Sequence, residues 1–230
     1  MDPAALPQGE EKTRAVRAMF DAIAPRYELV NRVMTFGLDA SWRRRTIADL
    51  RLPAGSLVLD VAAGTGDLSR ELARQGQRAV AADLSYGMLD AGHGVPELVQ
   101  ADVAALPFAD GAFDGVTCGY GLRNFTDLAG AFGEMARVTR PGGRISLLEV
   151  AEPRAGALRR LFRLWFRRVV PLIGAALSDG SAYRYLPRST AYLPAADEVA
   201  AMLRRAGFAA VNHWALMGGL SQQFVATRAA

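Results

Sequence analysis

A short apolar segment that runs directly into a glycine turn constrains this fold more than any other feature of the chain. Residues 57–61 read Leu-Val-Leu-Asp-Val, the turn reads Ala-Ala-Gly-Thr-Gly, and residues 67–75 have a helical pattern. A buried strand, a glycine turn and a helix in this order bring backbone N–H groups close to a nucleotide-like ligand. The next apolar run, 79–82, ends in Asp83, where nucleotide-binding α/β folds place an acid on the ribose hydroxyls. These residues predict an enzyme that uses an adenosine-containing cofactor.

Strand-like and helix-like segments alternate from Ser56 to the end of the chain. Alternation of this kind is typical of a parallel sheet with helices on both faces. Residues 141–143 (Pro-Gly-Gly) are expected as a tight turn before the fifth strand, and 218–219 (Gly-Gly) as the centre of a C-terminal antiparallel hairpin. We therefore predict an α/β fold, a doubly wound, mostly parallel seven-stranded sheet. Strands are expected near 57–61, 79–83, 97–101, 113–118, 144–150, 211–216 and 223–227, and helices near 67–75, 85–91, 127–139 and 194–206.

The residues before the first strand are expected to be helical. Residues 1–10 read as a flexible tail and residues 11–230 as a single domain. The first part of that domain, 11–50, is expected to form a helical cap over one edge of the sheet. Pro25 ends its first helix and Ser41 is the expected N-cap of its last. The three helical segments are expected over 11–23, 27–37 and 41–50.

The composition is that of a globular protein with a large core. Hydrophobic residues make up 51% and charged residues 22% of the chain, which excludes an intrinsically disordered protein. The net charge of +4 permits an anionic partner, such as nucleic acid or a membrane, but requires none. The single cysteine, Cys118, excludes an internal disulfide and is expected to be a small buried hydrophobic residue. With no secretory signal and no apolar run of about 20 residues, the expected compartment is the cytoplasm.

Residues 153–177 form an amphipathic segment, in which Pro171 is expected to bend or end the helix. One interpretation is a helix packed on the sheet with a solvated basic face. The other is an interfacial helix that faces anionic lipid. The basic side holds Arg159, Arg160, Arg163, Arg167 and Arg168, and the apolar side holds Leu158, Leu161, Phe162, Trp165, Val169, Leu172 and Ile173.

The glycine turn favours S-adenosylmethionine over a dinucleotide. It has Gly64 and Gly66 but lacks the full Gly-x-Gly-x-x-Gly pattern. Asp67, which follows, is a poor neighbour for a pyrophosphate and a reasonable N-cap for the helix. A cofactor without phosphates avoids this conflict. Its amino-acid end would bind the backbone at 64–66 and the hydroxyl of Thr65.

A third acid supports the same interpretation. Asp102 follows the third predicted strand, where its carboxylate can accept a hydrogen bond from the exocyclic amine of adenine. The N–H of Val103 can donate to a ring nitrogen. Three acids thus lie at the ends of three successive strands, at the carboxyl edge of the sheet, where open α/β folds bind their ligands.

On three further blocks the sequence resembles the menaquinone and ubiquinone biosynthesis C-methyltransferases, within the class I S-adenosylmethionine-dependent methyltransferases. The resemblance extends from about Val16 to Thr227 and implies a Rossmann-like methyltransferase fold. The blocks are 20–28 (Phe-Asp-Ala-Ile-Ala-Pro-Arg-Tyr-Glu) continuing to Asn31, Met34, Phe36, Gly37 and Trp42; 120–124 (Tyr-Gly-Leu-Arg-Asn); and 183–186 (Tyr-Arg-Tyr-Leu).

The resemblance implies that a defined set of residues contacts the cofactor. Relatives often have serine where this chain has Gly119, so only a backbone contact is expected there. Ala63 stands where many relatives have glycine, and its methyl should fit if its φ is negative. The implied contacts are Thr65, Asp83, Asp102 and Val103.

The implied reaction is methylation of a ring carbon of a polyprenylated quinol, with demethylmenaquinol favoured. Arg123 would stabilise the quinol anion and Asn124 would orient its hydroxyl. Tyr27 and Tyr183 would hydrogen-bond or stack on the ring, with Arg184 beside them. Residues 153–190 would face the substrate and an anionic membrane, which supplies a substrate that dissolves in the bilayer. No metal is expected, and His93 and His213 are expected at surface or packing positions.

Several alternatives stay open. The ring could be a benzoquinol of ubiquinone biosynthesis, and a methyltransferase of this class could act on RNA or another small molecule. No added RNA-binding module is visible, so nucleic acid is not an expected partner. An NAD-dependent oxidoreductase or a non-catalytic lipid-binding protein would also use an α/β fold. The prenyl tail length, the general base and the oligomeric state, including a homo-oligomer, are not specified by the sequence.

Overall fold

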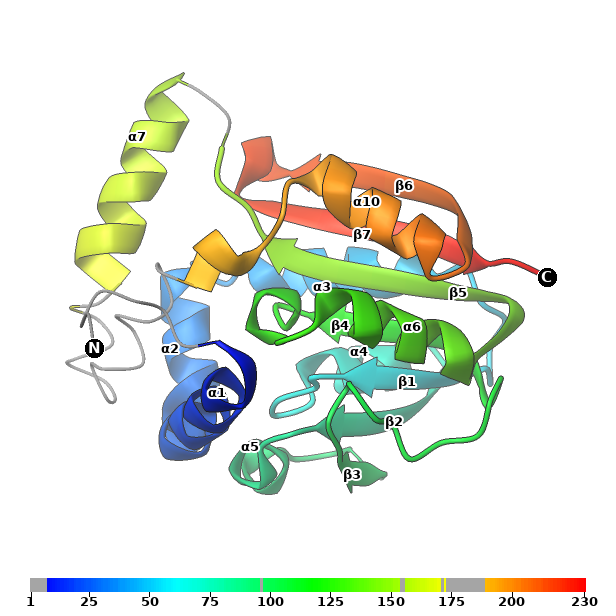
Figure 1. Cartoon of the computed structure of the whole chain (residues 1–230). Coiled ribbons are helices and arrows are strands. Elements are labelled where there is room, and N and C mark those ends of the chain that lie inside the picture. The colour runs from blue at the N-terminus through cyan, green and yellow to red at the C-terminus, as the bar shows by residue number, and fades with distance from the viewer. Residues whose placement is uncertain (1–7, 96, 154–155, 171, 173–188) are drawn as a thin grey trace.

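The computed structural model describes residues 8–95, 97–153, 156–170, 172 and 189–230. Its strands form one seven-stranded sheet in the order β3-β2-β1-β4-β5-β7-β6 (Figure 1). The first five strands run parallel, and β7 is antiparallel to both of its neighbours. The predicted α/β class and C-terminal hairpin are confirmed. The strands are β1 (Leu57–Val61), β2 (Arg78–Asp83), β3 (Leu98–Gln100), β4 (Phe113–Gly119), β5 (Thr139–Val150), β6 (Phe208–Leu216) and β7 (Ser221–Arg228).

The strand order reverses direction at β1. The chain builds outward from β1 through β2 to β3, then returns to place β4 on the other side of β1. In open parallel sheets such a reversal separates the loops at the carboxyl ends of the two central strands, and ligands bind there. The carboxyl ends of β1 and β4 therefore mark the expected position of a site.

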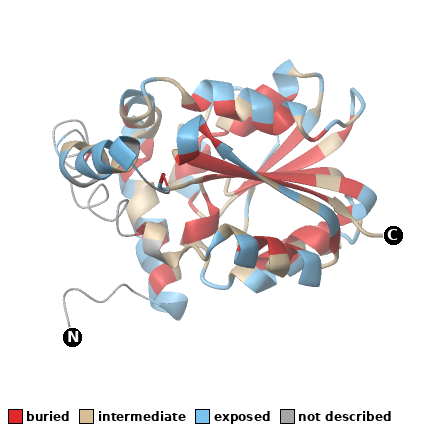
Figure 2. Cartoon of the chain, turned by 90° about the horizontal axis from the view of Figure 1, so that it is seen from above, coloured by how far each residue is buried: buried red, intermediate tan, exposed pale blue. Residues whose placement is uncertain are grey.

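Helices cover both faces of the sheet. On one face, α3 (Asp39–Ala48) and α4 (Asp67–Arg74) contribute Ile47, Leu68 and Leu72 to a cluster that includes Val58 of β1. On the other, α6 (Leu128–Val138) and α10 (Ala196–Arg205) cover the larger cluster. Buried residues follow the strands and the inner sides of these helices (Figure 2). A smaller helix, α5 (Tyr86–Ala91), follows β2.

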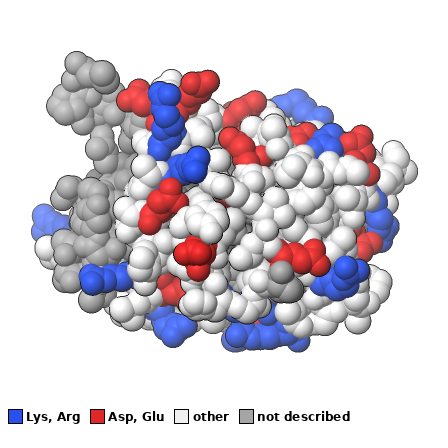
Figure 3. Space-filling view, turned by 90° about the horizontal axis from the view of Figure 1, so that it is seen from below, with Lys and Arg blue, Asp and Glu red and all other residues white. Residues whose placement is uncertain are grey.

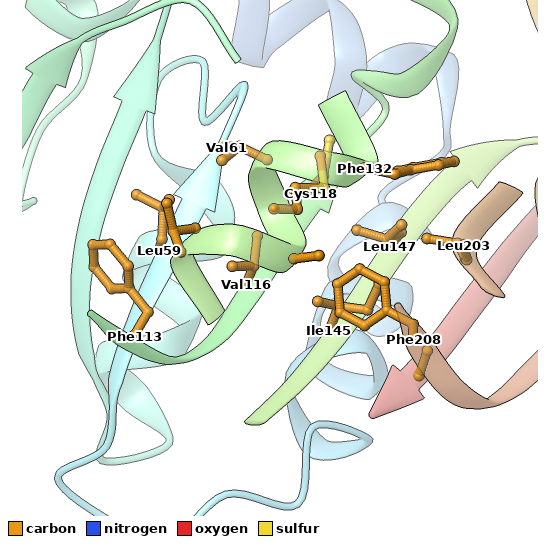
Figure 4. Close-up of a cluster of buried hydrophobic side chains, with 14 of the residues drawn as sticks. Leu59, Val61, Phe113, Val116, Cys118, Phe132, Ile145, Leu147, Leu203 and Phe208 are labelled. Carbon is orange, nitrogen blue, oxygen red and sulfur yellow. The ribbon is translucent and has the colours of Figure 1, made fainter. Parts of the chain in front are cut away.

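The larger core cluster fills the space between the sheet and the helices α6 and α10. Val116 of β4 and Leu147 of β5 pack with Phe132 of α6 and Leu203 of α10 (Figure 4). All four side chains are fully buried, which is the environment that stabilises a core most. Cys118 lies in the same cluster as a free thiol, so its expected role as a buried hydrophobic residue is confirmed.

The N-terminal helices lie beyond the carboxyl ends of the strands (Figure 1). They are α1 (Gly9–Ile23), the turn η1 (Ala24–Arg26) that contains Pro25, and α2 (Tyr27–Met34). α3 differs from them because it packs on a face of the sheet, although we expected the whole extension over one edge.

Two predicted helix caps are wrong. Ser41 lies inside α3, which begins at Asp39, and its hydroxyl donates to the carbonyl of Leu38 at 2.7 Å. At α4 the N-cap is Gly66, in the left-handed region at φ 85°. Only glycine adopts this conformation without strain, so Asp67 falls one position inside the helix.

The tight turn predicted at 141–143 is an irregularity inside β5 instead. β5 begins at Thr139, which pairs with Phe113, and the pairing then shifts so that Gly115 faces Arg144. Gly142 has φ 75° at this point. The turn residues were identified correctly, but they bend a strand rather than precede one.

The amphipathic segment is helical over the part that the structure describes. α7 (Gly156–Leu164) continues into a π-helical turn, η3 (Trp165–Val169). Arg159 and Arg163 of the predicted basic side both donate through Nε to Oε1 of Glu152, at 2.7 and 2.6 Å. Pro171 and the residues after Leu172 in this segment lie outside the described residues.

A buried carboxylate connects the strands and the helix that surround the glycine turn. Asp60 of β1 accepts hydrogen bonds from the hydroxyls of Ser69 on α4, at 2.7 Å, and of Thr117 on β4, at 3.1 Å. Burial raises the pKa of Asp60 to about 7, although both hydroxyls act to lower it. Asp60 therefore joins the three elements around the turn, and ionising it in this position opposes folding.

This pKa predicts how stability depends on pH. Between about pH 4 and about pH 7 the unfolded chain has lost the Asp60 proton and the folded chain retains it, so stability falls as pH rises. Asn at this position cannot ionise and can still accept one hydroxyl. In urea titrations across this window, we expect the unfolding free energy of the parent to fall relative to that of Asp60→Asn. The relative slope should not exceed about 1.4 kcal/mol per pH unit, and parallel curves would contradict the assignment.

Candidate functional site

A cavity of about 310 Å³ opens at the carboxyl ends of β1, β2 and β4, beside the glycine turn. Below it is called the glycine-turn cavity. Its volume is at the lower end of the range for small-molecule sites. Five predicted cofactor contacts line it, namely Gly64, Asp83, Asp102, Val103 and Gly119.

Asp83 fixes the shape of this cavity. Its Oδ2 accepts from the N–H of Gly64 and its Oδ1 from the N–H of Ser85, both at 2.8 Å. Burial raises the pKa of Asp83, with the backbone hydrogen bonds acting against that rise. A carboxylate oxygen has more than one acceptor position, so both oxygens retain capacity for a diol in the cavity.

Asp102 and Val103, which follow the neighbouring strand β3, offer an acceptor and a donor to the same cavity. Oδ1 of Asp102 accepts from the N–H of Ala104 at 2.9 Å, and among the described residues Oδ2 has no partner. The N–H of Val103 makes no hydrogen bond in the described part of the chain. This pair fits the edge of a purine that offers an amine and a ring nitrogen.

Two residues of the turn, Thr65 and Gly66, are not part of the cavity wall. A Cβ on Gly66 would come within 2.4 Å of Val95. The hydroxyl of Thr65 is buried and has no hydrogen bond of normal geometry. It lies near Glu28, whose pKa is lowered. Burial acts to raise that pKa, and Thr65 is one of the groups that lower it. The cofactor contacts of Thr65 and Gly66 stay predictions. Ala62 is the left-handed alanine of the turn, at φ 51°.

The structure agrees with what the sequence predicts for the backbone at Gly119 and Ala63. A Cβ on Gly119 would lie 2.8 Å from Cδ1 of Leu68, so this wall has little room for a side chain. Ala63 is not among the residues of positive φ, and its methyl is therefore compatible with the backbone.

Helix α1 forms a wall of the glycine-turn cavity that the sequence analysis did not identify. Asp21 accepts from the hydroxyl of Ser85 at 2.5 Å and from the N–H of Gly87 at 3.0 Å. Lys12 donates to the carbonyls of Phe125, at 2.7 Å, and Arg123, at 3.1 Å. Burial lowers the pKa of Lys12 to about 8. The residues of α1 that line the cavity are Glu10, Thr13, Val16, Arg17 and Phe20.

A second cavity of about 320 Å³ adjoins the first. It is called the aromatic cavity below, because its walls are mainly aromatic and aliphatic. Tyr27 and Tyr120 line both cavities and form the boundary between them. Burial raises the pKa of both phenols, so both stay protonated near neutral pH. The other apolar lining residues are Met34, Phe36, Leu38, Trp42, Val150, Leu161, Phe162, Trp165 and Leu220.

The predicted Arg-Asn pair, in the turn η2 (Leu122–Asn124), contributes to both cavities. Asn124 lines the glycine-turn cavity and Arg123 the aromatic cavity. The guanidinium of Arg123 is already paired with Glu149, and its Nη1 donates to the carbonyl of Tyr120 at 2.8 Å. Nε donates to the hydroxyl of Ser189 at 3.1 Å, and Nη2 has no hydrogen bond among the described residues.

Asp39 is the carboxylate that the sequence analysis missed. Among the described residues that line the aromatic cavity it is the only acid. It accepts from the hydroxyl of Thr35 at 2.8 Å and pairs with Arg43 at 2.8 Å. The signal was present in the sequence, but the helix was expected to begin at Ser41, which left Asp39 in a loop.

The other predicted residues lie away from both cavities or outside the described chain. Tyr183 and Arg184 are outside the described residues. His93 is exposed, and His213 stacks on Phe224 with ring centroids 4.8 Å apart. Both histidines thus occupy the surface and packing positions that were expected.

The linings of the two cavities suit a nucleoside in one and a flat apolar molecule in the other. Asp83, Asp102 and Val103 offer partners for ribose and adenine, whereas the aromatic cavity offers few polar groups. The boundary formed by Tyr27 and Tyr120 would place the two ligands next to each other. Groups held side by side in this way react faster because their orientation is already fixed.

Comparison with known proteins agrees with this geometry. The sequence model of the ubiE/COQ5 methyltransferase family matches residues 8–228. The demethylmenaquinone methyltransferase of Thermus thermophilus is 45% identical over 83% of this chain and 91% of its own. The ubiquinone/menaquinone biosynthesis C-methyltransferase UbiE of Geotalea uraniireducens is 37% identical over 94% of this chain and 97% of its own.

Solved structures share the fold. A putative methyltransferase from an antibiotic biosynthesis pathway of Anabaena variabilis superposes with a TM-score of 0.60, at 26% identity over 76% of this chain and 64% of its own. Phosphoethanolamine N-methyltransferase 2 of Haemonchus contortus, solved with S-adenosyl-L-methionine, has a TM-score of 0.62 at 14% identity over 83% of this chain and 53% of its own. The match of the family model over nearly the whole chain, and the identities of these relatives, show that the protein is a methyltransferase that belongs to the ubiE/COQ5 methyltransferase family.

Proposed function

We propose that this protein uses S-adenosylmethionine to methylate a ring carbon of a polyprenylated quinol, with demethylmenaquinol as its substrate. The observation that carries the proposal is the pair of adjoining cavities that share Tyr27 and Tyr120. One cavity has nucleoside-binding groups and the other is mainly apolar. The names of the Thermus thermophilus and Mycobacterium marinum relatives, both demethylmenaquinone methyltransferases, support this choice of ring.

The glycine-turn cavity would hold the cofactor. Asp83 would accept from the ribose hydroxyls, and Asp102 with the N–H of Val103 would bind adenine. The backbone at Gly64 and Gly119 would line the methionine portion. When bound there, S-adenosylmethionine supplies an electrophilic methyl group on a sulfonium.

The aromatic cavity would hold the quinol. Its ring carbon becomes nucleophilic when a hydroxyl loses its proton, and a phenol has a pKa of about 10, so the site must remove that proton. Tyr27 and Tyr120 do not serve as bases because burial raises their pKa values. Asp39 is suited to accept the proton, directly or through a water. Arg43, which pairs with Asp39 at 2.8 Å, would hold this carboxylate in position.

Arg123 would stabilise the quinol anion less than a guanidinium without an ion pair would. Its charge is largely balanced by Glu149, so it cannot act as a full positive charge on the quinol anion. Its Nη2 can still donate a hydrogen bond into the aromatic cavity. For Asn124, Tyr183 and Arg184 we propose the roles that the family resemblance implies.

A benzoquinol of ubiquinone biosynthesis is the second candidate, because the name of the Geotalea uraniireducens relative covers both quinones. RNA is less suited. On the face in Figure 3, the described basic side chains are interspersed with acidic ones, whereas RNA binding favours a continuous basic surface.

Incubation with methyl-labelled S-adenosylmethionine and short-chain quinols tests the proposal. We expect the label on a ring carbon of demethylmenaquinol, with slower transfer to the benzoquinol and none to RNA fragments. Mass spectrometry of the products identifies the labelled atom. Label on RNA alone, or no transfer to either quinol, would overturn the proposed function.

The glycine turn offers a test of the cofactor site. Gly64 has φ 59°, and a Cβ there would lie 3.1 Å from Cε of Met88. Gly64→Ala should strain the turn by about 1–2 kcal/mol and weaken S-adenosylhomocysteine binding by about tenfold in a calorimetric titration. Gly133→Ala is the matched control, because a Cβ on this residue of α6 meets open space. Equal affinities for the two variants would argue against a ligand at the turn.

Asp39→Asn tests the proton acceptor. Asn keeps the size of the side chain and can still accept from Thr35, but it cannot take a proton at neutral pH. We expect kcat to fall by about 100-fold or more, with cofactor affinity unchanged. Raising the pH toward the pKa of the quinol should restore part of the rate, because the substrate then ionises in solution. Asp110→Asn, at an exposed acid that pairs with Arg137, should keep the parental rate. A loss of rate that pH does not relieve would point to a purely structural role for Asp39.

A further inference from the structure

The four sides of α2 have four different environments. Val30 is fully buried, and Tyr27, Asn31 and Met34 line the aromatic cavity. Glu28 and Arg32 line a third, polar cavity of about 330 Å³. The outer side carries Leu29, Val33 and, just after the helix, Phe36, which are exposed by 55%, 39% and 71%. We call these three residues the α2 ridge.

The α2 ridge continues into the mouth of the aromatic cavity. Phe36 lines that cavity although it is mostly exposed, and so does Leu161 of α7, exposed by 67%. A side chain that lines a cavity and is also mostly exposed lies at the opening of that cavity. The ring of Phe36 packs on that of Trp165, with centroids 4.7 Å apart, and Trp165 donates to the carbonyl of Met34 at 3.3 Å. Apolar side chains of α2, of Phe36 and of α7 therefore lie next to one another at the mouth of the aromatic cavity.

Arginines outnumber carboxylates on the polar side of α2, next to the ridge. The polar cavity is lined by five arginines and three carboxylates. The carboxylates are engaged by Arg43, Arg70 and Arg74. Among the described residues Arg32 and Arg44 form no ion pair, although the charge of Arg32 helps to lower the pKa of Glu28. Guanidinium groups of this kind bind phosphate oxygens strongly.

We propose that α2 docks this protein on the surface of an anionic phospholipid bilayer. The α2 ridge enters the interface between headgroups and acyl chains, while Arg32 and Arg44 bind lipid phosphates. An apolar ridge beside basic residues is the arrangement that interfacial helices use. The inference rests on the proposed function in one respect: a polyprenylated quinol dissolves in the bilayer, and docking through α2 turns the mouth of the aromatic cavity toward it.

The basic side of α7 is less suited to the same task. Arg159 and Arg163 share the carboxylate of Glu152, which removes part of their attraction for anionic lipid. A role for these arginines in membrane binding stays a prediction, and the substitutions Arg159→Glu and Arg163→Glu would test it separately.

Co-sedimentation of the full-length protein with vesicles tests the inference. The vesicles contain phosphatidylcholine alone or phosphatidylcholine with phosphatidylglycerol. We expect Leu29→Gln/Val33→Gln to lower the partition coefficient by about tenfold or more on the anionic vesicles. Arg32→Gln/Arg44→Gln should lower it by a similar factor on these vesicles only, with the effect disappearing at high salt.

The matched control is Tyr86→Gln/Leu98→Gln. These residues are exposed by 61% and 44%, on α5 and on the edge strand β3, and neither belongs to the α2 ridge. We expect this variant to have the parental partition coefficient. The ridge variant, the arginine variant and this control should all unfold at the parental temperature. Ridge variants that bind vesicles as the parent does would overturn the inference, as would inorganic phosphate binding at Arg32 and Arg44 without any effect of their substitution on vesicle binding.

The turnover of a water-soluble short-chain quinol separates this inference from the proposed function. Leu29 and Val33 are not among the described residues that line the three cavities above. Their variant should therefore methylate that quinol at the parental rate and lose rate only with long-chain quinol in vesicles. A parent protein that does not methylate the soluble quinol, but still needs the α2 ridge for vesicle binding, would refute the proposed function and leave the docking surface supported.

Discussion

The ion pair between Arg123 and Glu149 holds together the elements that separate the two cavities. Glu149, at the end of β5, accepts from both the backbone and the guanidinium of Arg123. Through Arg123 the pair also reaches the carbonyl of Tyr120, the hydroxyl of Ser189 and the ammonium of Lys12. Removing one member of a buried pair leaves an uncompensated charge and costs about 3–5 kcal/mol. Because Tyr120 is one of the two residues shared by both cavities, this interaction supports one side of the boundary between them.

The fold and the centre of the cofactor site could be predicted from local sequence pattern. The strand-turn-helix at 57–75 and the alternation after it specify a doubly wound sheet, and the carboxyl ends of parallel strands meet at one edge. That geometric rule is sufficient to bring Asp83 and Asp102 to the same cavity although they are far apart in the chain. The hairpin followed from its two glycines and its flanking apolar runs.

The rest of the site could not be predicted because its contacts join residues with no common pattern. Lys12 bonds to carbonyls more than a hundred residues away along the chain, and nothing near Lys12 indicates it. Glu149 reads as one more strand residue until its partner is known. The wrong caps have a local cause. α3 begins at Asp39, two residues before Ser41, and Gly66 adopts a left-handed conformation that its neighbour Asp67 cannot easily take.

The position of α1 has a practical consequence for handling the protein. Because this helix forms a wall of the glycine-turn cavity and is anchored by Lys12 and Asp21, an affinity tag joined closely to it would disturb ligand access. The end of β7 lies on the opposite side of the molecule (Figure 1), where Arg228 donates to the carbonyl of Ala136 at 3.0 Å. Purification handles, fluorophores and surface-immobilisation linkers therefore belong at the C-terminus.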